Sequence, residues 1–335
     1  MTLSTFADPS GRADRWPSLA LEDWKDTYAT LHMWTQIVGK IRLVQTPWVN
    51  HSWHVTYQVT SRGVSTLPIP YEGRTFQIDF DFNDHRLLIQ TSEGAQRTMA
   101  LRPRSVADFY EELLALLAEL GFAIEIHTTP NEIAEAIPFE KDTVHASYDA
   151  EYANRFWRVL LQADRIFRQF RARFIGKSSP VHFFWGGFDL AVTRFSGRPA
   201  PVHPGGVPNL PDWIAREAYS HEVSSCGFWP GGDPAPYPMF YSYAYPEPDG
   251  FSSSLVRPRN AAYHPTLREF VLPYDEVRHA EAPESTLLEF LQSTYDAAAD
   301  TGAWDRAAPS YFFSLTSTVA RVFSHSMRSV QVLPC

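Results

Sequence analysis

The stretch TFQIDFDF at residues 75–82 decides the fold of the first half of the chain. Its apolar side chains, Phe76, Ile78, Phe80 and Phe82, alternate with polar ones at positions 77, 79 and 81. Successive side chains of a strand point to opposite faces of its sheet, so the alternation predicts a strand with one buried and one solvated face. Turn signals at 83–84 and 93–94 predict that residues 87–91 and 96–101 continue it as an antiparallel meander.

Helices are predicted on both sides of this meander. Apolar residues recur at helical spacing over 22–44, and Ser105 can cap a second helix that runs to Leu120 and stops at Gly121. The second half repeats the order, with a helix from Asp149 to Ile175 and a last amphipathic helix over 285–300. Between these helices, strands are predicted at 180–185, 190–195, 217–226, 239–245 and 269–273.

These elements predict an α+β fold made of two helix–antiparallel-meander–helix halves, with a cleft where the halves meet. A loose match between His51-Ser-Trp53 and His182-Phe-Phe-Trp185 suggests that the two halves are pseudo-duplicated. We expect a disordered leader over 1–15, an N-terminal half over 16–130, a C-terminal half over 131–305 and a divergent tail over 306–335.

The composition narrows the class of protein. The chain has 335 residues, a formal net charge of −9 and two cysteines, Cys226 and Cys335, which are too few for a disulfide framework or a thiolate zinc site. No apolar run approaches the ~18 residues of a spanning helix, and the segment from Met1 to Ala20 lacks the apolar core of a secretory signal. We therefore expect a cytoplasmic protein with no membrane or nucleic-acid partner. Nothing in the sequence indicates a cofactor or an oligomeric state.

Four runs of residues carry a resemblance to a known family. They are Trp16-Pro-Ser-Leu continuing through Thr27–Trp34, Val144-His-Ala-Ser-Tyr-Asp149, Ser179-Pro-Val-His-Phe-Phe-Trp185 and Glu217-Ala-Tyr-Ser-His221. In these runs the chain resembles a bacterial family known as domain of unknown function 5996. The resemblance extends from about Trp16 to Asp305 and leaves out the segment from Arg306 to Cys335. It implies no activity, cofactor or catalytic residue.

The first candidate site combines His182 with Glu217 and His221. On the predicted strand 217–226, Glu217 and His221 point to the same face of the sheet. Four residues at a rise of ~3.3 Å per residue place them about 13 Å apart. Two histidines and a carboxylate can form a non-haem metal site or a general acid–base pair. The alternative is a set of hydrogen-bonded histidines in a half-buried sheet, because neither H-x-D nor H-E-x-x-H spacing is present.

The second candidate site is aromatic. Its rings come from one alternating strand and two tryptophans of the same half: Tyr241, Tyr243, Tyr245, Trp185 and Trp229. Stacked rings with hydroxyl tips suit a sugar, a nucleobase or another flat metabolite, and Arg194 could supply charge for an anionic ligand. The alternative is a tyrosine-rich sheet face that a helix or loop covers.

Two clusters of charge complete the candidates. Paired carboxylates at Asp79 and Asp81, with Asp84 and His85 nearby, could bind a divalent ion or act in hydrolysis, but their regular alternation is typical of a solvated sheet face. Between Arg155 and Lys177 lie six arginines and one lysine, which could meet phosphate or an acidic partner. Pairing with the chain's own carboxylates is the alternative for that helix.

The preferred interpretation is a protein that binds a small polar or aromatic metabolite in a cleft lined by aromatic and histidine side chains. We expect ligand contacts from Trp185, Arg194, Trp229, Tyr241 and Tyr243, and polar or catalytic roles for His182, His221 and Glu217. One alternative is a metal-dependent enzyme that uses His182 and His221 as ligands and Glu217 as a third ligand or base. Another is an interaction module that uses the Arg-rich helix 155–177. The sequence alone does not decide whether the protein is an enzyme.

Overall fold

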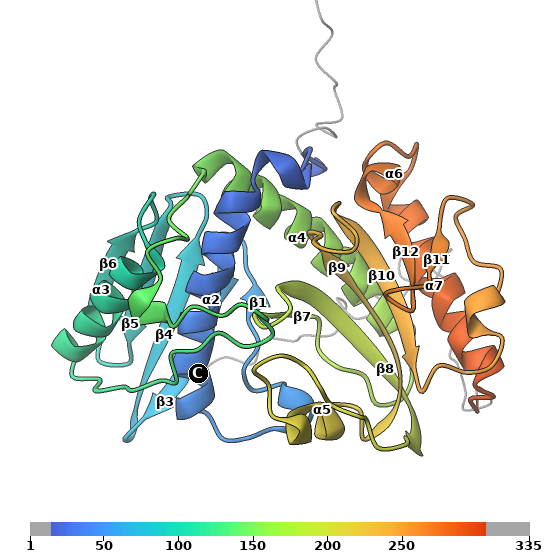
Figure 1. Cartoon of the computed structure of the whole chain (residues 1–335), viewed down its shortest axis with the longest axis horizontal. Helices are drawn as coiled ribbons and strands as arrows, with labels where there is room; N and C mark the ends of the chain where they lie inside the picture. The colour runs from blue at the N-terminus through green and yellow to red at the C-terminus, as the bar shows by residue number, and fades with distance from the viewer. Residues whose placement is uncertain (1–14, 306–335) are drawn as a thin grey trace, which may run out of the picture.

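The computed structural model describes residues 15–305, so the predicted leader, apart from Arg15, and the whole predicted tail lie outside the described residues. The chain forms an α+β fold with two antiparallel sheets, as the sequence predicts (Figure 1). Helix α2 (Lys25–Gln45) precedes the first sheet and α4 (Ala150–Ala172) precedes the second. Among the described residues, no helix has the length and apolar character needed to cross a membrane.

The first sheet has the order β1-β2-β4-β5-β6, and β3 also pairs with β4. The strands are β1 (Gln58–Val59), β2 (Gly63–Ser65), β3 (Ile69–Tyr71), β4 (Arg74–Asp81), β5 (Arg86–Thr91) and β6 (Gln96–Ala100). The deciding stretch forms β4, and Phe76, Ile78, Phe80 and Phe82 are all buried as predicted. After β6, Ser105 caps α3 (Val106–Glu119), because its Oγ accepts the amide N–H of Asp108 at 3.0 Å.

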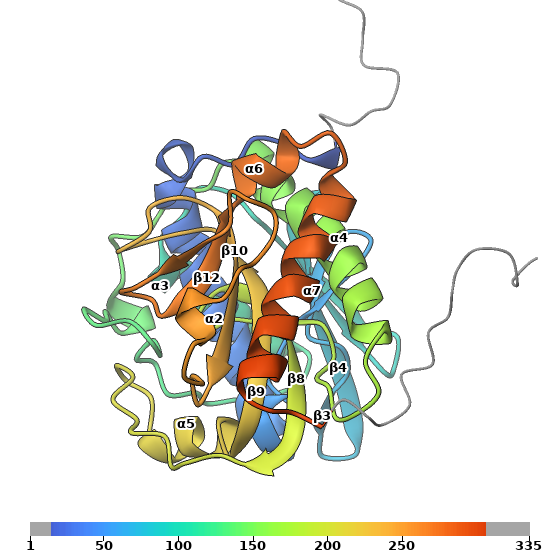
Figure 2. The same cartoon turned by 90° about the vertical axis from the view of Figure 1, so that its right-hand side faces the viewer.

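The second sheet has the order β11-β12-β10-β9-β8-β7. Its strands are β7 (His182–Phe184), β8 (Asp189–Pro199), β9 (His221–Trp229), β10 (Met239–Tyr245), β11 (Ala262–His264) and β12 (Glu269–Pro273). Helices α4 and α7 (Pro283–Thr301) pack on one face of this sheet, with α6 (Tyr274–Arg278) between β12 and α7 (Figure 2). Phe167 of α4 contacts Phe240 of β10 on that face, at 6.3 Å between ring centroids.

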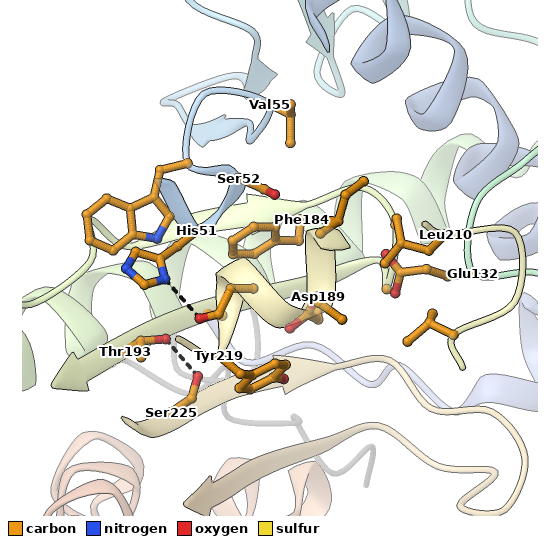
Figure 3. A pocket seen from close by; sticks show the side chains of 18 of the residues that line it. His51, Ser52, Val55, Glu132, Phe184, Asp189, Thr193, Leu210, Tyr219 and Ser225 are labelled. Atoms are coloured by element: carbon orange, nitrogen blue, oxygen red, sulfur yellow. Dashed lines mark hydrogen bonds between the residues drawn. The ribbon is translucent and has the colours of Figure 1, made fainter. Parts of the chain in front are cut away.

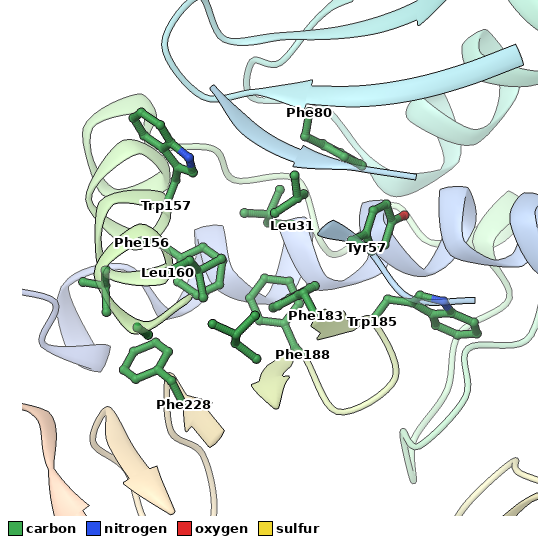
Figure 4. Close-up of a cluster of buried hydrophobic side chains, with 14 of the residues drawn as sticks. Leu31, Tyr57, Phe80, Phe156, Trp157, Leu160, Phe183, Trp185, Phe188 and Phe228 are labelled. Carbon is green, nitrogen blue, oxygen red and sulfur yellow. The ribbon is translucent and has the colours of Figure 1, made fainter. Parts of the chain in front are cut away.

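The two sheets meet through their first strands. Tyr57, next to β1, and Phe183 of β7 form an antiparallel bridge in which each amide N–H donates to the other's carbonyl at 2.9 Å. Their rings join a cluster that includes Leu31 of α2, Phe80 of β4 and Phe156 of α4 (Figure 4). One hydrophobic core therefore continues from the first half into the second.

Helix α2 is buried on more than the one face that its helical spacing of apolar residues indicates. Every residue from Thr30 to Ile41 is buried. The reason is tertiary, because α2 lies between the two sheets and packs against both halves (Figure 1). At Gly39 the backbone approaches the second half so closely that a Cβ would overlap the indole of Trp185.

Two predicted strands are also different. Residues 212–218 form helix α5 (Asp212–Ala218), so Glu217 is helical and β9 begins only at His221. Pro211 at the N-cap and Asp212 in the first turn favour this helix start. The alternation of apolar and polar residues over 53–60 also predicts a strand, but only Gln58 and Val59 pair as one. The residues from His54 to Tyr57 are all buried where the chain crosses between the halves. The internal duplication stays a prediction, which superposition of residues 20–125 on 150–300 tests.

Candidate functional site

A cavity of about 320 Å³ lies on the face of the second sheet that is turned away from α4 and α7. Its floor consists of odd-numbered residues of β8, β9 and β10, whereas even-numbered residues such as Phe240 point to the helices. The walls are η2 (Asn50–Ser52) with the residues that follow it, the pair Asn131-Glu132, and α5 with its preceding loop (Figure 3). Both halves of the chain therefore contribute to the cavity.

The floor is a network of tyrosines and hydroxyl groups. The rings of Tyr241 and Tyr243 stack at 6.2 Å between centroids, and the hydroxyl of Tyr243 lies 2.9 Å from that of Tyr219. Beside them the hydroxyls of Thr193 and Ser225 are 2.8 Å apart. Gly227 makes this arrangement possible, because a Cβ at that position would overlap the ring of Tyr241. The floor thus offers flat apolar surface with hydrogen-bonding tips.

One end of the cavity is acidic. Burial raises the pKa of Asp189 to about 6, although its carboxylate accepts a hydrogen bond from the hydroxyl of Tyr241. Desolvation within the cavity and the neighbouring charge of Asp189 raise the pKa of Glu132 to about 7, although the Glu132 side chain is open to the cavity. The same two causes raise the pKa of Glu269, on β12, to about 8. Asp189 thus disfavours the ionisation of two neighbouring carboxyl groups, Glu132 in the cavity and Glu269 on β12.

The turn Gly186-Gly187 brings two of these carboxylates together. A Cβ on Gly186 would overlap the carboxylate of Glu132. The point that a Cβ on Gly187 would occupy lies 3.1 Å from Oδ1 of Asp189 and 3.8 Å from Oε2 of Glu132. The backbone of Glu132 has a positive φ of 62°, and its amide N–H donates to the carbonyl of Pro208 at 2.8 Å. The two glycines therefore leave room for a carboxylate from each half of the chain.

The other end of the cavity is basic. Nδ1 of His51 donates to the carbonyl of Ala218 at 2.8 Å, which leaves Nε2 to accept from the Lys177 ammonium at 2.6 Å. Burial lowers the pKa of His51, and the charge of Lys177 lowers it further. On β8, Asp189 and Phe195 lie at the two ends of the cavity. They are six residues apart, which corresponds to about 20 Å at a rise of ~3.3 Å per residue. Lys177 thus lies beside this end of the cavity, where the Glu217 carboxylate also accepts the amide N–H of His51 at 3.2 Å.

The predicted ligand-binding residues separate into two groups. Trp185, Tyr241 and Tyr243 line the cavity. Arg194 points to the opposite face of the sheet, where its guanidinium lies 3.4 Å from the ring centroid of Phe170 and its side chain donates to that residue's carbonyl. Trp229 lines a neighbouring cavity instead. Strand parity explains Arg194, because positions 189, 191, 193 and 195 of β8 face the cavity.

The three residues of the first candidate site do not come together. His182 pairs with Ala191, Ala191 pairs with Gly227, and His221 lies six residues from Gly227 along β9, about 20 Å at the strand rise. No single ion with bonds of about 2 Å reaches both histidines. Burial lowers the pKa of His182 to about 3, its Nδ1 lies 2.9 Å from the hydroxyl of Thr56, and its Nε2 has no hydrogen-bond partner. Glu217, on helix α5, accepts a hydrogen bond of 3.2 Å from the amide N–H of His51.

The charged clusters are paired within the chain. Asp81 lies 2.7 Å from Nε of Arg62, which also reaches Asp84 at 2.8 Å, and Nδ1 of His85 lies 2.9 Å from the hydroxyl of Tyr148. On α4, the ion pairs are Arg155–Glu151, Arg165–Glu284 and Arg168–Asp164. The ion pairs of α4 agree with the alternative for that helix. Asp81 is buried, so the prediction of a solvated sheet face is wrong at that position, where the side chain pairs with Arg62.

A second cavity, of about 460 Å³, shares Glu132, Gly186 and Gly187 with the first. His145 lines it, and Nδ1 of that histidine lies 2.7 Å from the fully buried carboxylate of Asp142. A carboxylate can only accept here, so Nδ1 carries the proton and Nε2 is left to exchange one. The two cavities therefore place an oriented histidine and the Glu132 carboxylate around one space.

Sequence reasoning missed Glu132, Asp189, Tyr219 and His51. The paired glycines at 186–187 were the available signal, since they mark a close backbone approach, but no sequence pattern identifies the group that approaches. Glu132 comes from an irregular link in the other half, and its role depends on how the halves pack.

Comparisons with known proteins agree with the resemblance in the sequence. The model of a family of unknown function, DUF5996, matches residues 16–310. No curated protein matches the chain. No solved structure matches it either. Since the match covers most of the chain, the protein belongs to the DUF5996 family of unknown function.

Proposed function

We propose that this protein binds a small polar or aromatic metabolite in the tyrosine-floored cavity between its halves. The observation that carries the proposal is the combination of stacked Tyr241 and Tyr243 rings with the Asp189 carboxylate in one cavity of about 320 Å³. Ligand sites are typically concave, largely apolar and equipped with a few converging polar groups. This volume is at the lower end of the range of ~300–1,000 Å³ for small-molecule pockets.

A thermal-shift screen of a metabolite panel tests the proposal. Ala191 lines the cavity, so Ala191→Leu reduces its volume, whereas Ala262→Leu makes the same change on the exposed edge strand β11. A ligand at 100 times its Kd stabilises the native state by about 2.7 kcal/mol, which gives a clear shift in Tm. We expect hits to shift the wild type and Ala262→Leu but not Ala191→Leu. A panel without hits, or hits that shift Ala191→Leu equally, would contradict the proposal.

The second cavity favours a second candidate function, which is acid–base catalysis on the bound metabolite. A positioned histidine contributes roughly 10²–10⁴-fold to a proton-transfer step. The hits of the screen can be incubated with the protein in D₂O and followed by proton NMR for conversion or exchange. We expect His145→Ala to slow any conversion by at least about tenfold at saturating ligand. His127→Ala, at an exposed histidine, serves as the control. Conversion that persists unchanged in His145→Ala would refute this candidate.

A further inference from the structure

We infer that the ligand carries a protonated amine, which docks at the acidic end of the cavity between Glu132 and Asp189. The inference rests on the proposed function and adds the chemical class of the ligand. It follows from the arrangement of carboxylates, aromatic rings and basic groups around the cavity.

The carboxyl groups at the acidic end of the cavity have no countercharge among the described cations of the protein. Asp189 lies near both Glu132 and Glu269, and its charge raises the pKa of each of them. Within residues 15–305, no lysine, arginine or histidine forms an ion pair with any of the three. The described cations on the cavity side are at its other end, where Lys177 is engaged with His51. A ligand cation would therefore pair with carboxyl groups that no described cation of the protein pairs with, and would favour their ionised form.

The surroundings of the carboxylates also suit an amine. The titratable groups that face this end from the first cavity are Tyr241 and Tyr243 of the floor and Tyr219 at the end of α5. From the adjoining cavity they are Tyr28, His32, Glu135 and His145, and the imidazole of His145 is held by the Asp142 carboxylate. Burial keeps the tyrosines neutral by raising their pKa values. Burial lowers the pKa of His32 to about 4, so it too is neutral. The ring faces beside the carboxylates suit an ammonium group, which aromatic quadrupoles attract.

A metal ion, a neutral ligand and an anionic ligand are the alternatives to an amine at the acidic end of the cavity. In the described part of the chain, no group of three or more His, Cys, Asp or Glu side chains has the geometry to hold a metal ion. A neutral sugar or alcohol could hydrogen-bond to the same groups, but it would leave the carboxylates without a countercharge. A carboxylate ligand would add a like charge to them. The amine is the occupant that the charges favour.

The test uses isothermal titration calorimetry on the full chain with matched pairs of probes. The pairs are benzylamine with benzyl alcohol, tyramine with its alcohol analogue, and 1,5-diaminopentane with 1,5-pentanediol. We expect at least one amine to bind about tenfold or more tightly than its neutral partner, because a charged hydrogen bond is lost with the alcohol. Amine binding should also ionise carboxyls that hold protons near pH 7, so the measured enthalpy should change with the ionisation enthalpy of the buffer.

Two isosteric variants assign the effect to the site. Glu132→Gln and Asp189→Asn should each weaken amine binding about 10- to 100-fold and leave alcohol binding within about twofold. Glu125→Gln, at an exposed glutamate, is the matched control. Thermal unfolding of each variant shows that it is folded, and either variant alone is sufficient for the test.

The outcomes separate this inference from the proposed function. Alcohols that bind as tightly as amines, or amine affinity that survives both variants, would overturn the inference and leave the metabolite-binding proposal standing. Absence of binding by every probe would overturn the inference, and the wider metabolite panel would then decide the proposed function. Tighter amine binding with proton release, lost in Glu132→Gln, would support both.

Discussion

Replacing Asp189 with Asn removes one ionisable group from the acidic end of the cavity, together with the charge that raises the pKa of Glu132 and Glu269. The amide has the shape of the carboxyl group, and its oxygen can still accept the hydrogen bond that the hydroxyl of Tyr241 donates to Asp189. We predict that the substitution changes how the free energy of unfolding depends on pH.

The sign follows from proton binding. Burial raises the pKa of Asp189 from its ordinary value of 3.8 to about 6, so between these pH values the folded chain holds a proton that the unfolded chain has lost. The free energy of unfolding therefore falls as pH rises through this window. Since a pKa difference of one corresponds to 1.36 kcal/mol, the full effect is at most about 3 kcal/mol. About half of it, roughly 1.4 kcal/mol, falls between pH 5 and pH 8.

Urea denaturation of the ligand-free protein at several pH values from 5 to 8 measures this effect. We expect Asp189→Asn to gain about 1 kcal/mol relative to the wild type between pH 5 and pH 8, because solvent in the cavity screens part of the full value. Glu132 and Glu269 remain in both proteins and give a slope of the same sign. That slope is smaller in Asp189→Asn, because the charge of Asp189 no longer raises the pKa of the two glutamates. Asp249→Asn, at an exposed aspartate, should run parallel to the wild type. Parallel profiles for Asp189→Asn and the wild type would refute the assignment of a raised pKa.

Three further predictions concern the rest of the fold. Arg194→Ala should destabilise the protein by about 2–4 kcal/mol through lost packing on Phe170 and Tyr295, whereas Arg194→Met should change stability far less. Loss of ligand affinity in a stable Arg194→Met variant would contradict our placement of Arg194. Gly39→Ala should lower the free energy of unfolding, measured by urea denaturation, by about 1–3 kcal/mol or more, because its Cβ overlaps the Trp185 indole. Adding Trp185→Phe to that variant should restore part of the loss, and an unchanged urea midpoint in Gly39→Ala would argue against the close approach. The protein should not bind mixed-sequence DNA or RNA at physiological salt, since arginines of α4 pair with carboxylates of the same chain. Salt-sensitive micromolar binding that disappears in the double variant Arg158→Glu/Arg165→Glu would show otherwise.

Part of the predicted grouping of residues agrees with the structure, because strand parity can be read from sequence. Tyr241 and Tyr243 alternate on one strand, and they do share the floor of one cavity. The same parity separates Arg194 from Thr193, but the sequence contains no indication of which face the helices α4 and α7 cover. Glu217 was misplaced because a short segment after Pro211 can form a helix or a strand, and local pattern decides poorly between them.

By itself the sequence determined the elements whose signals are local. The alternation in β4 and the caps at Ser105 and Asp149 each depend on residues a few positions apart, so the polypeptide backbone alone relates them. The acidic end of the cavity depends on residues that are far apart in the chain. Glu132 and Asp189 meet only because the edge strands pair at Tyr57 and Phe183 and the glycine turn admits both carboxylates. Their raised pKa values are properties of that packing, since burial and the closeness of Asp189 to Glu132 exist only in the folded chain.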